Sequence, residues 1–202
     1  MSDAVARVAV FLSGSGSNLQ ALIDATKAGI LKAEIALVIS SSDKAYGLVR
    51  AADCGIKTLV FNAKSYASLE AAESDLLSKL REHDIQYIAL AGYLKLLPTA
   101  VVRAYRNRIV NIHPALLPKY GGKGMFGHHV HEAVIAAGET ESGPTVHLVN
   151  EIYDEGRILE QIKVPVMSDD TPDTLAARVL EQEHKLYPRV LQKLIRGDYA
   201  LD

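Results

Sequence analysis

Short apolar segments alternate with longer helical segments along the chain, and this alternation limits the possible folds more than any other feature. The segments Val8–Leu12 (VAVFL) and Tyr87–Tyr93 (YIALAGY) are apolar at nearly every position, which is typical of strands buried on both faces. Strands that alternate with helices form crossover units in a mostly parallel sheet. The sequence therefore predicts an α/β fold, with a Rossmann-like, mostly parallel sheet and helices on both of its faces.

The expected elements cover most of the chain. We expect strands at Arg7–Leu12, Glu34–Ile39, Thr58–Phe61, Tyr87–Ala91, Ile109–Ile112, Pro144–Val149 and Ile158–Val164, and helices at Ser17–Ala28, Tyr46–Cys54, Ser65–His83, Thr99–Tyr105, Val130–Ala137 and Thr171–Ile195. The last two strands alternate apolar with polar residues around the turn Tyr153–Gly156, which predicts a C-terminal hairpin at the sheet edge. Neither a repeat nor a linker interrupts the pattern, so we expect a single domain over residues 1–202.

The composition excludes several classes of protein. The 202 residues are 49% hydrophobic and carry a net charge of −2, so a sizeable core can form and a nucleic-acid partner is not expected. The apolar runs are too short to span a bilayer, and Met1–Arg7 lacks a signal-peptide pattern, so we expect a cytoplasmic protein without a membrane partner. Cys54 is the single cysteine, which excludes an intrachain disulfide; we expect it to be a packed small residue. The oligomeric state stays open between monomer and homodimer.

The loop Ser13–Asn18 (SGSGSN) lies between the first expected strand and the first expected helix. Its backbone N–H groups and the positive end of the helix dipole suit a phosphate group. The third glycine of a dinucleotide fingerprint would fall at Leu19, and no Gly-Lys-Ser/Thr sequence follows. The loop thus predicts a phosphate site rather than a dinucleotide site, and a tight turn without a ligand is the alternative.

The segment Ile109–Pro118 (IVNIHPALLP) places polar side chains at the end of an apolar strand. Asn111 and His113 are two residues apart in an extended run, so they point to the same side, where ligands of open parallel sheets bind. An asparagine amide can donate to an oxyanion, and a histidine can move protons near neutral pH. Asp154, in the hairpin turn, is the candidate third group that orients the imidazole. The alternative is a strand end whose polar groups only satisfy the backbone.

Two segments together carry a resemblance to a known family. They are Ser13–Leu19 (SGSGSNL) and Asn111–Tyr120 (NIHPALLPKY), supported by matches at Ala91–Pro98, Thr145–Val149 and Gln182–His184. In this order, over nearly its whole length, the chain resembles the glycinamide ribonucleotide formyltransferases, which are folate-dependent enzymes of purine synthesis. The resemblance implies that a formyl group passes from 10-formyltetrahydrofolate to the amine of glycinamide ribonucleotide through a tetrahedral intermediate.

The resemblance also implies roles for individual residues and no metal. Asn111 would hydrogen-bond the developing oxyanion, His113 would stabilise it as a cation or move protons, and Asp154 would hold His113 and a proton-carrying water. We expect Asp154 to raise the pKa of His113. The ribonucleotide would contact Gly14, Ser15, Gly16, Ser17 and Asn18 through its phosphate, and Glu183 elsewhere. The folate would lie against Leu94, Lys95, Leu96, Leu97, Val149, Glu151, Ile152 and Tyr153.

Two positions depart from the family pattern. Lys95 stands where relatives often carry an arginine; it can still attract the glutamate tail of a folate, but it lacks the planar fork. The connection Gly121–Val130 looks several residues longer than in relatives. Its four glycines would suit a mobile lid, although its role stays open.

Four histidines outside the catalytic strand also need an interpretation. His128, His129 and His131 could bind zinc, but their spacing is not the helical His-Glu-x-x-His pattern, so we favour the plainer interpretation of a loop that enters a helix at Val130. His147 could face the site or be a satisfied core histidine.

Four other functions compete with formyl transfer. A hydrolase would release formate from the same folate with the same three residues, but such relatives usually carry an added domain before this segment, and we expect no room for one. A methionyl-tRNA formyltransferase would need a further C-terminal domain and a basic surface. A nucleotide-dependent oxidoreductase could use Asp43 to bind ribose, but this chain lacks the third glycine of the dinucleotide fingerprint. A non-catalytic module would bind phosphate and folate without turnover.

Overall fold

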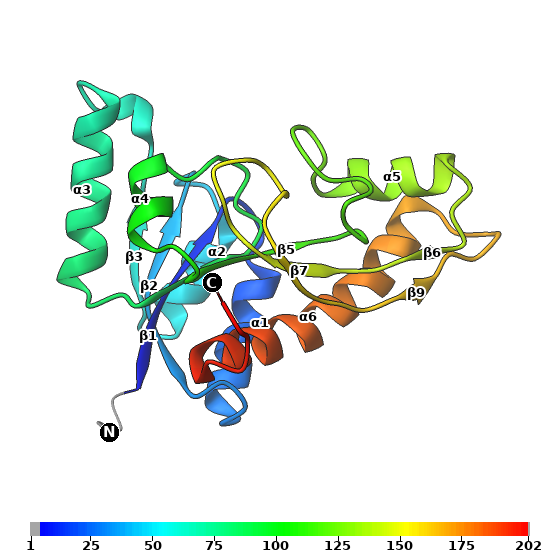
Figure 1. The fold of residues 1–202 in the computed structure, drawn as a ribbon, viewed down its shortest axis with the longest axis horizontal. Coiled ribbons are helices and arrows are strands. Elements are labelled where there is room, and N and C mark those ends of the chain that lie inside the picture. Colours follow the sequence, from blue (N-terminus) through cyan, green and yellow to red (C-terminus); the bar gives the residue numbers. More distant parts are fainter. Residues whose placement is uncertain (1–4, 202) are drawn as a thin grey trace.

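The computed structural model describes residues 5–201 and contains one large sheet (Figure 1). Its seven strands lie in the order β3-β2-β1-β4-β5-β7-β8. Their bounds are β1 (Ala6–Leu12), β2 (Ala33–Ser40), β3 (Lys57–Val60), β4 (Tyr87–Leu90), β5 (Ile109–His113), β7 (Thr145–Leu148) and β8 (Ile158–Gln161). Strands β1 to β5 pair in parallel, whereas β7 and β8 are antiparallel and form the hairpin at one edge. The predicted fold class, including this edge hairpin, is confirmed.

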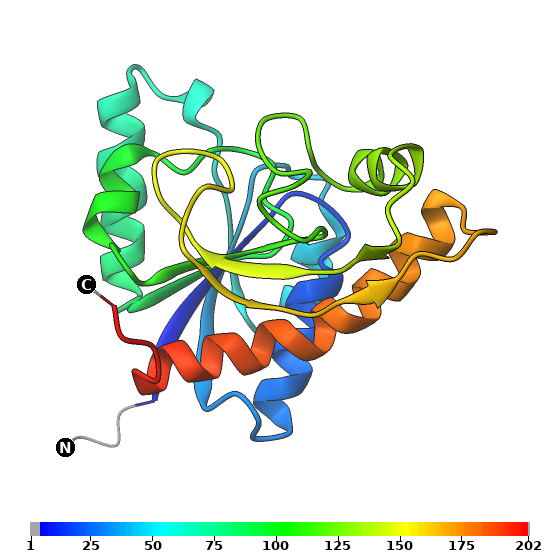
Figure 2. The same cartoon turned by 45° about the vertical axis from the view of Figure 1, so that its right-hand side comes forward.

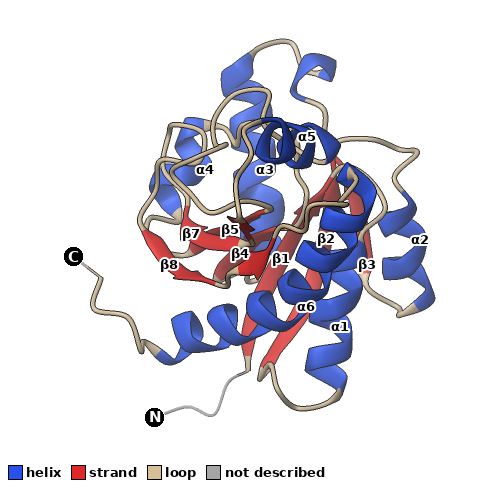
Figure 3. Ribbon diagram, turned by 90° about the vertical axis from the view of Figure 1, so that its right-hand side faces the viewer, coloured by secondary structure: helices blue, strands red, loops and turns tan. Residues whose placement is uncertain are grey.

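Helices cover both faces of the sheet because both faces of its central strands are apolar. Along β1, Val8 and Val10 belong to the core beneath α1 (Ser17–Lys27), α2 (Tyr46–Asp53) and α6 (Pro172–Arg196). Ala9 and Phe11 point the other way and pack with α3 (Leu69–Glu82) and α4 (Thr99–Ala104). Figure 3 shows the sheet between these two layers of helices.

The last helix, α6, runs along much of the length of the molecule (Figure 2). Thr171 caps it through a reciprocal hydrogen-bond pair with Thr174, Pro172 occupies its first turn, and Gly197 ends it in the left-handed region at φ 76°. The N-terminal part of α6 packs with α5 (His128–Ala136) in a third apolar cluster that includes Leu175 and Val179. No helix within residues 5–201 is both long and apolar enough to cross a membrane.

Three expected boundaries were wrong. The expected strand Ile158–Val164 ends at Gln161, because the chain turns past Gly143 so closely that a Cβ there would meet the Ile162 carbonyl oxygen at 1.8 Å. The chain then continues as β9 (Val164–Pro165), which pairs with β6 (Glu141–Ser142) in a separate small sheet.

The two other differences concern helix starts. Helix α3 begins after Ser68, whose hydroxyl oxygen accepts from the Ala71 N–H at 3.2 Å, and a short 3₁₀ turn, η1 (Ala63–Ser65), precedes it. Helix α5 begins at His128 rather than Val130, directly after Gly127 at φ 55°. His128 and His129 therefore lie on the first turn of a helix and not in a loop.

Candidate active site

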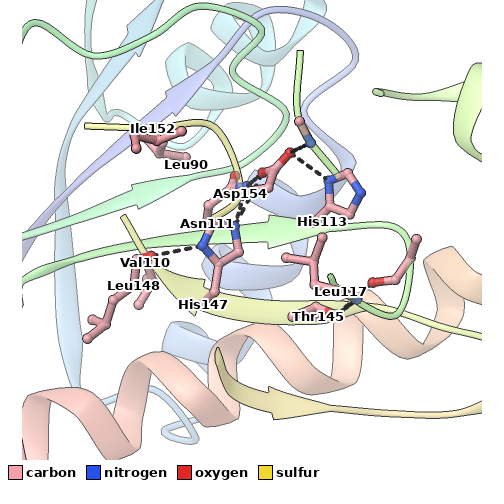
Figure 4. Close-up of polar contacts among 12 residues, drawn as sticks. Leu90, Val110, Asn111, His113, Leu117, Thr145, His147, Leu148, Ile152 and Asp154 are labelled. Atoms are coloured by element: carbon pink, nitrogen blue, oxygen red, sulfur yellow. Dashed lines mark hydrogen bonds and ion pairs between the residues drawn. The ribbon is translucent and has the colours of Figure 1, made fainter. Parts of the chain in front are cut away.

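Three predicted catalytic side chains converge at the carboxyl end of β5 (Figure 4). The Asn111 amide nitrogen donates to Asp154 Oδ1 at 3.3 Å. His113 Nδ1 lies 3.6 Å from Asp154 Oδ2. His113 is buried and Asn111 is half-buried, so the cluster sits at the floor of a cleft and faces its interior.

The carboxylate of Asp154 is held from several directions. The Gly122 N–H donates to Asp154 Oδ2 at 2.9 Å, and His147 Nε2 lies 3.4 Å from Oδ1. Asp154 itself has φ 56°, in the left-handed region that few non-glycine residues adopt. Burial raises the pKa of its carboxyl group, but the neighbouring imidazoles and the Gly122 N–H together lower it below its usual value. Asp154 is therefore ionised at neutral pH.

Both ring nitrogens of His113 face acceptors. Nε2 donates to the Tyr120 carbonyl oxygen at 2.7 Å, while Nδ1 faces the Asp154 carboxylate. This surrounding favours the protonated imidazolium, whereas burial favours the neutral ring. The effect of burial is the larger, so the pKa of His113 lies below its usual value even though Asp154 raises it. Asp154 thus raises the pKa of His113 as expected, but burial lowers it more and decides the direction of the net shift.

His147 is a member of this cluster that the sequence left undecided. It lies directly opposite Asn111 in the antiparallel pairing of β5 with β7. Its Nδ1 lies 2.8 Å from the Leu148 carbonyl oxygen and its Nε2 lies 3.0 Å from the Asn111 amide nitrogen, so these partners suit the tautomer in which Nδ1 donates and Nε2 accepts. Both hydrogens of the Asn111 amide are therefore engaged, one by His147 and the other by Asp154.

The loop between β1 and α1 turns its carbonyl oxygens away from the cleft. The Gly14 carbonyl oxygen accepts from the Gly47 N–H at 3.1 Å, and that of Ser15 accepts from Arg50 Nε at 2.9 Å. The Gly16 carbonyl oxygen accepts from the Gln20 N–H at 2.9 Å. Within residues 5–201, no acceptor pairs with the N–H groups of Ser15, Gly16 and Ser17. Such a row of free donors at a helix N-terminus can bind an anion.

Asn18 and Glu183 meet beside this loop, although 165 positions separate them in the chain. The Asn18 amide nitrogen donates to Glu183 Oε2 at 2.6 Å, and both residues are buried. Burial raises the pKa of Glu183 and outweighs the bond from Asn18, which lowers it. Asn18 Oδ1 has no partner within the described chain. This pair therefore offers an unused acceptor and a carboxyl group of raised pKa to a polar ligand.

A cleft of about 600 Å³ joins these groups. Of the residues proposed from the sequence, its lining includes Ser17, Asn18, Leu94, Lys95, Leu96, Leu97, Asn111, His113, Val149, Ile152, Tyr153, Asp154 and Glu183. Gly14, Ser15 and Gly16 precede its wall without lining it. Glu151 also lies outside, and its carboxylate accepts from Arg103 Nε at 2.8 Å.

The long connection after β5 forms another wall of the cleft. Gly122, Gly124 and Gly127 have positive φ angles, and residues 122–128 all line the cleft. His131 also lines it; burial lowers its pKa to about 4, and its Nδ1 has no partner within the described chain. Among residues 5–201, no three histidine, cysteine, aspartate or glutamate side chains are grouped so that they could hold a metal ion.

Comparison with known proteins places this architecture in a family. The family model described as "Formyl transferase" matches residues 6–191. The chain belongs to the formyl transferase family. Two curated members are phosphoribosylglycinamide formyltransferases. The chloroplastic protein of Vigna unguiculata is 44% identical over 93% of this chain, which spans only 60% of that protein's length. The protein of Escherichia coli (strain K12) is 40% identical over 94% of this chain and 87% of its own.

Solved structures agree with this membership. The phosphoribosylglycinamide formyltransferase of Brucella melitensis superposes with a TM-score of 0.87 at 46% identity, covering 98% of this chain and all of that one. A formyltetrahydrofolate deformylase from Pseudomonas syringae has a TM-score of 0.86 over 98% of this chain and 64% of its own. At 23% identity, that second likeness shows only that the deformylase has the same fold as this formyl transferase chain.

Proposed function

We propose that this formyl transferase moves a formyl group from 10-formyltetrahydrofolate to the amine of glycinamide ribonucleotide in purine synthesis. The observation that carries the proposal is one continuous cleft. Its lining includes the cluster of Asn111, His113 and Asp154, the end of the anion-binding loop at Ser17 and Asn18, and the apolar wall Leu94–Leu97. A reaction between a phosphorylated amine and a folate needs a site for the phosphate and an apolar site for the folate, both next to the reacting groups.

The walls suit these two substrates. The free N–H groups at the start of α1 would hold the ribonucleotide phosphate, and the Asn18–Glu183 pair would contact its polar body. Leu94, Leu96 and Ile152 line the cleft and are about half exposed, which is unusual for such large apolar side chains. They would cover the folate ring system, while Lys95 would attract its glutamate tail.

The catalytic groups would stabilise the tetrahedral intermediate. The amine nitrogen attacks the formyl carbon, its lost proton reaches N10 of the folate, and the C–N10 bond breaks. His113 in its protonated form would neutralise the oxyanion, and Asp154 favours that form. For Asn111 to donate as well, the oxyanion must replace the longer of its two contacts, the 3.3 Å bond to Asp154. Asp154 would then be free to accept from a proton-carrying water.

The remaining features of the proposal concern the protein as a whole. We propose that it acts as a single domain in the cytoplasm, as a monomer or homodimer, with small-molecule substrates and neither nucleic acid nor metal. The alternative activity is hydrolysis of 10-formyltetrahydrofolate, in which water replaces the amine. Hydrolysis would use the same three catalytic residues, but it has no need of an anion-binding loop beside them.

An assay of folate deformylation with and without glycinamide ribonucleotide tests the proposal. We expect turnover only with the ribonucleotide, and a loss of about 10²- to 10⁴-fold in kcat for His113→Ala, the range typical of a group that moves protons. His83→Ala, which removes an imidazole outside the cleft, is the matched control and should keep its activity. Formate release without the ribonucleotide would identify a hydrolase, and binding without any turnover would identify a non-catalytic module.

A further inference from the structure

Helix α2 supplies two hydrogen-bond donors to the loop that precedes α1. One is the backbone N–H of Gly47, which binds the Gly14 carbonyl oxygen, and the other is the side chain of Arg50, which binds that of Ser15. The helix lies so close that a Cβ on Gly16 would meet the Gly47 Cα at 2.6 Å. Arg50 does not line the cleft, so it can act on a ligand there only through the loop or through its charge.

The guanidinium of Arg50 is fixed on three sides. Its carbon lies 5.0 Å from the centroid of the Tyr46 ring, one turn earlier on α2. Its Nη1 donates to Gln20 Oε1 on α1 at 3.4 Å, and its Nε binds the Ser15 carbonyl oxygen at 2.9 Å. The side chain thus bridges α2, α1 and the loop, and only a planar fork can make these contacts at the same time.

The planar peptide between Ser15 and Gly16 links the Arg50 contact to the direction of the Gly16 N–H, which can bind a ligand. In a trans peptide, the C=O of one residue and the N–H of the next point in opposite directions. An Arg50 that holds the Ser15 carbonyl outward therefore directs the Gly16 N–H toward the anion. In the same way Gly47 fixes the Ser15 N–H through Gly14, and Gln20 fixes the Ser17 N–H through Gly16. Of these three peptides, only that of Ser15 and Gly16 depends on a side chain.

We propose that Arg50 is a positioning residue of the phosphate loop, which sets the affinity for the phosphate by holding the Ser15–Gly16 peptide with its N–H toward the ligand. Without this contact the peptide can rotate and present a carbonyl oxygen to the anion. The inference rests on the proposed function only in naming the ribonucleotide as the source of the phosphate. Its chemistry applies to any phosphate monoester at this loop.

A simple charge effect is the competing explanation, and Lys44 provides its control. Lys44 lies two residues before α2, is exposed, and makes only a backbone contact to the Ser42 side chain in the described chain. Lys44→Gln and Arg50→Gln each remove one positive charge on or just before α2, but only the second removes the bond to Ser15. Arg50→Lys keeps the charge and loses the fork, and it serves as well if Arg50→Gln folds poorly.

The first measurement is binding without catalysis. Ribose 5-phosphate is titrated into the ¹⁵N-labelled protein while the amide signals of Ser15, Gly16 and Ser17 are followed. We expect Arg50→Gln to weaken binding about tenfold, the size of one lost hydrogen bond to a charged group. Arg50→Lys should fall between wild type and Arg50→Gln, and Lys44→Gln should change binding less than twofold. Equal losses in Lys44→Gln and Arg50→Gln, or no loop response in the wild type, would overturn the inference.

The second measurement separates positioning from general damage. In the formyl-transfer assay, Arg50→Gln should raise KM for glycinamide ribonucleotide about tenfold, while kcat and KM for the folate stay within about twofold. Equal changes in all three constants would indicate damage to the fold and contradict the positioning role. If the wild type binds ribose 5-phosphate at the loop but transfers no formyl group, the proposed function fails and the inference about Arg50 stands.

Discussion

At the scale of single residues, Asp154 organises the candidate site. It contacts Asn111 on β5, His147 on β7 and the backbone of Gly122 in the following connection. Strands β5 and β7 are already paired in the sheet, whereas the Gly122 connection is rich in positive-φ glycines and is tied to these strands through the Asp154 carboxylate. The carboxylate also opposes the effect of burial on His113. One side chain thus contacts three segments and favours the protonated form of His113.

Replacement of Asp154 by asparagine tests its electrostatic part. The pKa of His113 is already lowered by burial, and the Asp154 carboxylate is the main influence that raises it. Asp154→Asn removes this negative charge, so the protonated ring loses stabilisation and the pKa of His113 falls further. An NMR titration of the His113 ring proton, with His83 as the internal control, measures the change. An unchanged or higher pKa of His113 in the variant would contradict this account.

The sequence predicted part of this cluster because part of it is local. Asn111 and His113 share a side through the two-residue period of a strand, and the structure brings both to Asp154. His147 stayed undecided because its place opposite Asn111 depends on the register between β5 and β7, which no local pattern specifies. The Tyr120 carbonyl and the Gly122 N–H could not be found either, since backbone groups leave no signal in residue types.

At the scale of elements, the contact between α2 and the loop before α1 depends on a glycine. A Cβ on Gly47 would lie 2.4 Å from Leu12 Cδ2 and 2.9 Å from Cδ1, and Leu12 is fully buried. The helix can therefore approach β1 and the loop only while position 47 has no side chain. The loop before α1 therefore depends on a glycine outside it, Gly47 on α2, as well as on its own glycines.

Gly47→Ala should lower the free energy of unfolding by about 1–3 kcal/mol, the usual cost of overpacking a filled core. The added methyl group must displace either the fully buried Leu12 side chain or the whole of α2. Urea denaturation followed by circular dichroism measures the change. Gly14→Ala is the stability control, because a Cβ there meets nothing within 4 Å. An equal, small effect of both substitutions would show that α2 moves away without cost.

Element types were easier to predict than element ends. The largely apolar β1 and β4 and the capped start of α6 lie within one residue of their expected limits. The strand expected to end at Val164 was wrong because its last residues leave the hairpin to pair with β6, a partner of two residues that no sequence period reveals. Tertiary pairing, rather than local preference, decides such short strands.

At the scale of the whole molecule, α6 connects the binding groups to the sheet. Glu183 faces Asn18 near one end of the cleft, and Tyr187, one turn later, is fully buried under the sheet. An amphipathic pattern alone would place Glu183 on a solvated face, and only the resemblance to the family suggested a ligand role. Further along, Glu160 on β8 accepts from Arg189, Lys193 and Tyr199. The helix is thus attached to α1, to the central strands and to the edge hairpin.

The attachment to the central strands can be tested with one hydroxyl group. Tyr187 Oη lies 2.9 Å from the Leu90 carbonyl oxygen on β4 and 3.1 Å from that of Val110 on β5. Strand β4 is followed by the wall Leu94–Leu97, and β5 contains Asn111. Tyr187→Phe keeps the ring and removes the only bonds between α6 and these two carbonyl oxygens recorded within residues 5–201. We expect the free energy of unfolding to fall by about 1–3 kcal/mol, because the buried carbonyl groups lose a donor that water cannot replace.

Urea denaturation of Tyr187→Phe, with Tyr46→Phe as the matched control, measures this effect. The Tyr46 ring is exposed, so loss of its hydroxyl should change stability by no more than about 0.5 kcal/mol. If α6 holds the carboxyl end of β4 through Leu90, Tyr187→Phe should also raise KM for the folate, since the wall Leu94–Leu97 follows shortly after β4. A stability loss without any change in folate KM would mean that the ends of these strands are fixed by the sheet alone. Equal stability of the two variants would show that α6 is held by its apolar face and not by this hydroxyl.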